Sequence, residues 1–155
     1  MTAPNAFSER NTLMNWIHLL PVALLVWGAT TGCTSPRLTV TDVWSRPAQA
    51  GDNGAVYFKV NNGTVHGDTL LGVETDVADS AEMHLSMSDA NGVMSMGQQM
   101  SVEVPANSTV EFKPGALHVM LLSLQNDLRV GDTFTVTLML RNAGNVSVSV
   151  TVENP

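Results

Sequence analysis

The amino-acid sequence predicts an all-β domain, a β-sandwich of eight or nine short strands that follows an N-terminal export segment. Charged residues make up only 14% of the chain, and Val, Thr and Ser are common in its second half, a composition that favours strands over helices. Short strand-like runs are separated by turn residues such as Asn61-Asn62-Gly63 and Lys113-Pro114-Gly115. No segment shows a sustained period of 3.6 residues, so helices are not expected.

The first 33 residues have the layout of an export signal. Residues 16–29 form an almost continuous apolar run, which is shorter than the roughly 20 residues that a membrane-spanning helix needs. Small residues then lead to Cys33, an order that resembles a bacterial lipoprotein signal. We therefore expect residues 1–32 to be a signal peptide and Cys33 to be lipidated. An uncleaved anchor with an unmodified cysteine is the alternative.

The expected strands follow a short linker, residues 33–37, and lie in a domain that covers residues 38–155. Residues 38–46 alternate between polar and apolar side chains and end at a proline, and the next run closes at the Asn-Asn-Gly turn. After the first run, the expected strands are residues 55–60, 69–77, 81–87, 93–96, 100–104, 109–112, 117–124, 133–140 and 146–152. Short strands at such regular spacing are typical of a β-sandwich.

Charge and cysteine content exclude several classes of function. The net charge of −7 would repel phosphate backbones, so nucleic acid is not an expected partner. Cys33 is the single cysteine, so the domain after it has neither a disulfide nor a thiolate metal cage. A blue-copper electron carrier would need such a thiolate. No nucleophile with a base, and no recognisable pair of catalytic carboxylates, indicates an enzyme.

Sulfur and imidazole gather in one window of the sequence. Two of the four histidines, His84 and His118, lie there together with six of the nine methionines, which are Met83, Met87, Met94, Met96, Met100 and Met120. Nine methionines are many for a strand-rich chain, and thioethers and imidazoles are both metal ligands. This window is therefore the candidate functional site.

Strand parity separates the candidate ligands from core residues, because residues two apart in a strand share a face. In the run around His84, the apolar residues alternate with the histidine, so His84 is expected to point away from the core. The same alternation in residues 117–121 places His118 and Met120 opposite the apolar face. A methionine beside a histidine on a non-core face is not explained by gap filling.

The other methionines divide into two groups. Those read as core residues are Met83, Met87, Met100 and Met139. Met94 and Met96 share a strand face, and parity alone does not choose between them as a further ligand. Two imidazoles with two thioethers form a neutral, soft ligand set, which favours Cu(I) over Zn(II) or Mg(II). Methionine sulfur also cannot form disulfides in an oxidising compartment.

At these residues the sequence resembles the periplasmic PCuAC copper chaperones. The family signature is matched by His84-Leu85, ten residues, Met96, twenty-one residues, then His118-Val119-Met120. The resemblance implies a cupredoxin-like, Ig-like Greek-key sandwich that binds one Cu(I) through His84, Met96, His118 and Met120, with Met94 as a possible alternative ligand.

The same resemblance implies a biological role. The protein would be exported, periplasmic and held to a membrane through a lipid on Cys33. It would deliver Cu(I) towards cytochrome c oxidase, either directly to subunit II or through a thiol-bearing assembly factor. The alternative is a structural or adhesive β-sandwich whose methionines are core residues and which binds no metal.

Overall fold

The computed structural model describes residues 37–88 and 92–155, and residues 34–155 form one compact unit. The signal peptide predicted for residues 1–32 and the lipidation of Cys33 lie outside the described residues. Within the two described ranges, no helix has the length and apolar character needed to span a membrane.

The described residues form ten strands and no helix, which confirms the all-β prediction. The strands are β1 (Leu38–Ser45), β2 (Gly54–Asn62), β3 (Asp68–Thr75), β4 (Ala78–Ser88), β5 (Met94–Gln99), β6 (Val102–Val104), β7 (Ser108–Phe112), β8 (Leu117–Leu124), β9 (Thr133–Leu140) and β10 (Gly144–Val152). The number exceeds the expected eight or nine. Each of the ten strand-like runs named from the sequence overlaps one of these strands. Strand β5 pairs with β4 whereas β6 pairs with β3, so the chain passes from one edge of the sheet to the other between them.

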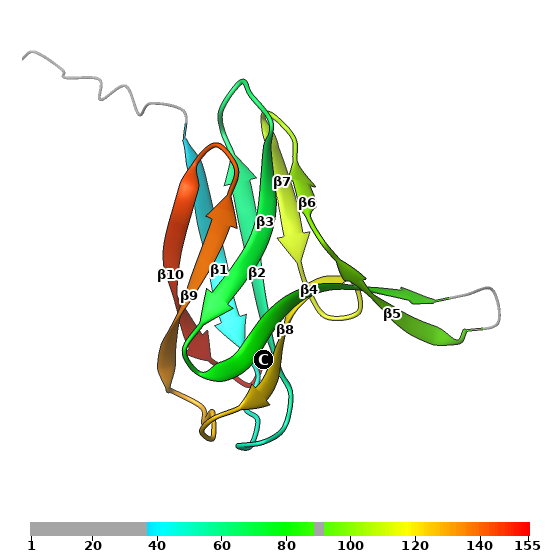
Figure 1. Cartoon of the computed structure of the whole chain (residues 1–155), viewed down its shortest axis with the longest axis vertical. Coiled ribbons are helices and arrows are strands. Elements are labelled where there is room, and N and C mark those ends of the chain that lie inside the picture. The colour runs from blue at the N-terminus through cyan, green and yellow to red at the C-terminus, as the bar shows by residue number, and fades with distance from the viewer. Residues whose placement is uncertain (1–36, 89–91) are drawn as a thin grey trace, which may run out of the picture. The chain divides into compact units, whose positions relative to one another are not determined.

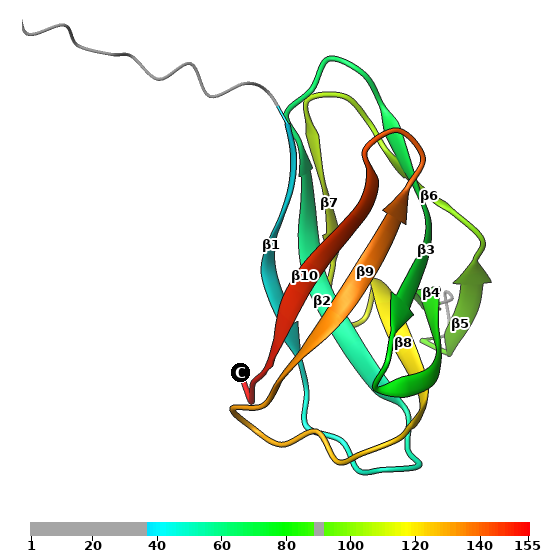
Figure 2. The ribbon, with the colours of Figure 1, turned by 60° about the vertical axis from the view of Figure 1, so that its left-hand side comes forward.

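The strands form one hydrogen-bonded path that folds over on itself as a sandwich. Its order is β5-β4-β8-β2-β1-β10-β9-β3-β6, and β7 also pairs with β2. Strands β1 and β10 are parallel and connect the two halves. Figures 1 and 2 show the layer of β10, β9 and β3 lying over the layer of β1, β2 and β7. Strands β4 and β5 lie at one end of the path, and their hairpin projects beyond the sandwich (Figure 1).

The core lies between these layers and follows from the period-2 alternation of their strands. In β9, Phe134, Val136, Leu138 and Leu140 are buried while the intervening side chains are more exposed. From the other layer, Phe58 of β2 stacks on Phe112 of β7 with ring centres 4.2 Å apart. Burying such side chains contributes roughly 1.5–3 kcal/mol each, so the apolar alternation read from the sequence stabilises the sandwich.

Two buried polar side chains hold the turns at the end of the sandwich where β2 meets β3. The Asn62 amide donates to the carbonyls of His66, Val104 and Pro105, and its oxygen accepts from Thr64. Asp68 accepts the backbone N–H groups of its neighbour and of the β9–β10 turn. These bonds satisfy backbone groups that burial would otherwise leave without partners.

Candidate metal site

Strands β4 and β8 place the two candidate histidines directly opposite each other. His84 pairs with His118, Met83 with Val119, and Glu82 with Met120. Directly opposite residues of an antiparallel ladder point to the same side, and Met83 and Val119 are both in the core. His84, His118 and Met120 therefore lie together on the other face, as parity predicted.

This second face of β4 and β8 is partly buried around the histidines. His118 is only 8% exposed, and both His84 and Met120 are partly buried. The imidazole rings of His84 and His118 have centres 6.1 Å apart and are inclined by 38°. A metal ion about 2 Å from one nitrogen of each ring would leave the ring centres about 6 Å apart. The two rings are thus spaced to hold one ion between them.

In an imidazole that carries one proton, as metal binding requires, hydrogen bonds fix which nitrogen carries it. His118 Nδ1 donates to the carbonyl of Ala116 at 2.9 Å, so its Nε2 keeps the lone pair. His84 Nε2 donates to the Glu82 carboxylate at 2.9 Å, so its Nδ1 keeps the lone pair. Metal-binding histidines in proteins are oriented by such bonds. Each ring therefore offers one free acceptor nitrogen.

The free nitrogen of His84 is itself evidence of fit. His84 Nδ1 is buried and has no hydrogen-bond partner among the described residues. A buried polar atom without a partner costs about 1–3 kcal/mol, and a bound cation would remove that cost. The donor set on this face is nitrogen and thioether sulfur, which suits a soft ion.

Strand β5 adds two exposed thioethers on the same face. Met96 is opposite Ser86 and Met94 is opposite Ser88, while His84 is opposite Gln98. The even-numbered residues of β4 and β5 thus share the face that carries His84. Met96 is 60% exposed and Met94 is 59% exposed. The structure therefore brings His84, His118 and Met120 together on β4 and β8, and places Met96 and Met94 on the adjoining edge strand.

Three methionines that the sequence analysis read as core residues are not core residues. Met87 is 51% exposed and Met100 is 80% exposed. Pairing of β4 with β8 ends at Leu85, so Met87 lies on the projecting hairpin without a second layer to cover it. Met100 lies in the bend after β5. Met139 lies between Leu138 and Leu140 on the outer face of β9, and only Met83 is in the core.

Sequence reasoning gave no role to Glu82, which the structure places against His84. The signal was present in the spacing, because Glu82 and His84 are two residues apart on one strand and so share a face. The other partner, the backbone carbonyl of Ala116 that accepts from His118, is positioned by the turn before β8. A backbone group leaves no side-chain pattern in the sequence, so it could not be predicted.

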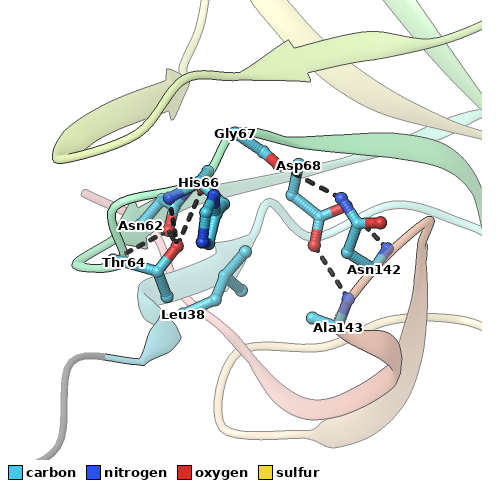
Figure 3. A pocket seen from close by; sticks show the side chains of 8 residues that line it. All are labelled: Leu38, Asn62, Thr64, His66, Gly67, Asp68, Asn142 and Ala143. Atoms are coloured by element: carbon cyan, nitrogen blue, oxygen red, sulfur yellow. Dashed lines mark hydrogen bonds between the residues drawn. The ribbon is translucent and has the colours of Figure 1, made fainter.

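A hollow away from this face is structural in character (Figure 3). Its lining residues are Leu38, Asn62, Thr64, His66, Gly67, Asp68, Asn142 and Ala143. Both Asp68 oxygens accept backbone N–H groups, and both polar atoms of the Asn62 side chain are bonded. Across the described part of the chain, no three His, Cys, Asp or Glu side chains group as a metal site.

Comparisons with known proteins agree with this fold. The family model described as "LpqE-like: Putative lipoprotein LpqE-like" matches residues 38–152, and the chain belongs to that family. An uncharacterised protein of Rickettsia prowazekii is 31% identical over 119 residues, which are 72% of this chain and 64% of that protein's length. The "Putative lipoprotein Lxx21020" of Leifsonia xyli is 28% identical over 126 residues, 81% of this chain and 75% of that protein.

Solved structures of PCuAC domains share the fold. The "Copper-bound PCuAC domain from PmoF2" superimposes with a TM-score of 0.64 at 26% identity, over 77% of this chain and 94% of that domain. The "Solution structure of CuI-DR1885" from Deinococcus radiodurans gives a TM-score of 0.53 at 25% identity, over 77% and 81% of the two chains. The PCuAC resemblance and the cupredoxin-like fold that it implied are confirmed.

Proposed function

We propose that this protein is an extracytoplasmic copper chaperone that binds one Cu(I) through His84, Met96, His118 and Met120. The observation that carries the proposal is the pair of imidazoles on β4 and β8, which are 6.1 Å apart between ring centres. Each ring is held by a hydrogen bond that leaves its other nitrogen free. Thioethers lie on the same face of β8 and β5.

The chemistry of this face supports Cu(I) as the cargo. Two neutral imidazoles and two thioethers bring no ligand charge to offset a dication, and sulfur of this kind prefers soft ions. Glu82, which is opposite Met120, is already bonded to His84 Nε2. The titles of two similar structures name copper-bound and Cu(I) forms, and we extend that cargo to this chain by proposal.

The geometry also supports release to a partner. Met96 is mostly exposed on an edge strand, whereas His118 is buried. An incoming ligand from an acceptor protein can therefore replace Met96 first, while the imidazoles still hold the ion. Each exchange breaks one bond to copper and forms another, so no redox partner is needed. The exposure of Met94, Met96, Met87 and Met100 counts against the alternative of a metal-free sandwich with core methionines.

The destination and the location of the protein follow from the PCuAC resemblance and the lipoprotein family. We propose export, lipidation at Cys33, and delivery of Cu(I) to cytochrome c oxidase subunit II or to a thiol-bearing assembly factor. Copper-loaded protein mixed with apo subunit II should lose its metal to that acceptor faster than to buffer alone. Equal rates of loss would contradict directed delivery.

Binding itself is tested by titrating the protein with Cu(I) against a chromophoric chelator. We expect one tight equivalent, which is lost or strongly weakened in His118→Ala and in Met120→Leu. His66→Ala is the matched control, because His66 lies in the turn between β2 and β3 and lines the structural hollow. Unchanged binding in the His118 and Met120 variants would overturn the proposal, as would equal loss in the His66 variant.

A further inference from the structure

Two thioethers lie on the free edge of the sheet: the proposed ligand Met96 and its neighbour Met94. In the described part of the chain, β5 pairs with β4 alone and ends the strand order. Met94 and Met96 lie two residues apart on one face of β5, and each is more than half exposed. Their Cα atoms are therefore about 6.5–7 Å apart, a span that the two long side chains can close around one soft ion.

This pair leads towards the histidines. Met94 is opposite Ser88, Met96 is opposite Ser86, and the next residue of β4 on that face is His84. Diagonal neighbours across an antiparallel pair are about 7–8 Å apart between Cα atoms, within reach of long side chains. A row of soft ligands thus runs from the projecting hairpin in Figure 1 to the covered imidazoles.

Burial changes steeply along this row. Met94 and Met96 are open to a partner, whereas His84 Nδ1 is buried and His118 is 8% exposed. A donor or acceptor protein can touch the thioethers of β5 but has little access to the rings. The thioethers of β5 are therefore the candidate ligands on this face that are most open to a partner protein.

We propose that Met94 and Met96 form an outer Cu(I) station through which the ion enters and leaves the His84–His118 pair. Met96 belongs to both stations. On entry, the bond from copper to Met94 sulfur breaks as a bond to His84 nitrogen forms, Met96 stays bound throughout, and bonds to His118 nitrogen and Met120 sulfur then complete the four-ligand site. Copper remains Cu(I), so the step needs no electron and no proton carrier. This inference rests on the proposed function.

The matched pair of variants is Met94→Leu and Met87→Leu in the full-length chain. Leucine keeps an apolar side chain of similar volume but cannot bind copper. Met87 is on the same hairpin and is also exposed, but it lies on the opposite face, where it is paired with Ser95. The comparison therefore separates two effects: the loss of a thioether on the face that carries His84, and the loss of any exposed methionine on this hairpin.

Three quantities decide the outcome: the equilibrium affinity, measured by chelator competition, and the rates of uptake and of release, measured by stopped-flow exchange with a chromophoric Cu(I) chelator. An outer station changes rates without changing the final site. We expect Met94→Leu to keep the wild-type affinity and to slow uptake and release by the same factor, so that their ratio is unchanged. Met87→Leu should leave all three values at the wild-type level.

Other results would overturn the outer station in distinct ways. Wild-type rates in Met94→Leu would remove Met94 from the route. Equal slowing in Met87→Leu would assign the effect to general hairpin properties. An affinity loss of tenfold or more in Met94→Leu would make Met94 a resident ligand. If wild-type protein binds Cu(I) and His118→Ala does not, the proposed function stands even where the outer station fails; if wild-type protein binds none, both fail.

Discussion

Replacing Asp68 with asparagine should destabilise the fold through the turns that this carboxylate joins. Asp68 is buried at the start of β3. Its Oδ1 accepts the backbone N–H groups of Thr69 at 2.7 Å and Asn142 at 2.9 Å. Its Oδ2 accepts the N–H of Ala143 at 2.9 Å. The two bonds from Asn142 and Ala143 tie β3 to the turn between β9 and β10.

The expected loss can be worked out from these contacts. Asp68→Asn keeps one oxygen but turns an NH₂ group towards one of the N–H donors, so at least one backbone donor loses its partner. The remaining bonds lose the assistance of a full negative charge. A bond to a charged group contributes about 1.5–3 kcal/mol, and an unpaired buried donor costs about 1–3 kcal/mol. We expect the free energy of unfolding to fall by roughly 2–4 kcal/mol.

This effect should depend on pH in a defined direction. Burial raises the pKa of Asp68, but the backbone N–H bonds from Asn142, Thr69 and Ala143 outweigh burial and hold its pKa below the ordinary value of 3.8. A lowered pKa in the folded state stabilises the protein above the unfolded pKa, and that stability is lost as the pH falls through the folded pKa. The difference between wild type and Asp68→Asn should therefore be full at neutral pH and shrink below about pH 4.

Urea unfolding followed by tryptophan fluorescence measures both properties, since Trp44 lies against Tyr57 on adjacent strands. Asp52→Asn is the control, because Asp52 is exposed and such surface changes are usually within about 0.5 kcal/mol. An unchanged urea midpoint in Asp68→Asn would refute the reasoning. So would a stability difference of the same size at neutral and acid pH.

Three further outcomes follow from the contacts. Glu82→Ala should lower the Cu(I) affinity by about 10–100-fold in chelator competition, because His84 loses the bond that orients it; wild-type affinity would show that Glu82 has no such role. Leu138→Ala should cost about 2–5 kcal/mol in urea unfolding and leave the copper affinity of the folded protein unchanged, whereas a weaker site would mean that core and site are coupled. A Cβ on Gly72 would lie 2.6 Å from Met139 Cε, so Gly72→Ala should displace that flexible side-chain end at a small cost in stability, and at less cost in a Met139→Ala background. Strict additivity of those two changes would contradict that contact.

The sequence was sufficient for the fold class because the alternation of β9 and β8 reports directly which face is buried. It was also sufficient to place His84, His118 and Met120 off the core face, since strand parity does not depend on knowing the partner strand. What parity could not supply was the cover over that face. His118 is buried although it is not in the core, and burial of this kind depends on tertiary packing.

The prediction that Met87 is a core residue was wrong for a related reason. Parity puts Met87 on the same face as Met83, and the register agrees. The core ends before Met87, however, because β8 no longer accompanies β4 beyond Leu85. Long-range pairing between strands decides where one strand extends beyond its neighbours. Local alternation contains no information about it, and the edge position of β5 was out of reach for the same reason.

The central claim is that one Cu(I) sits between two imidazoles and two thioethers on β4, β8 and β5. X-ray absorption at the copper edge, on protein loaded with one equivalent of Cu(I), tests this most directly because it identifies the atoms bound to the metal. The account predicts two nitrogen and two sulfur ligands in the wild-type protein, one sulfur fewer in any copper that Met120→Leu still binds, and one nitrogen fewer in any that His118→Ala still binds. A first shell of nitrogen and oxygen without sulfur, or a shell unchanged in both variants, would contradict it.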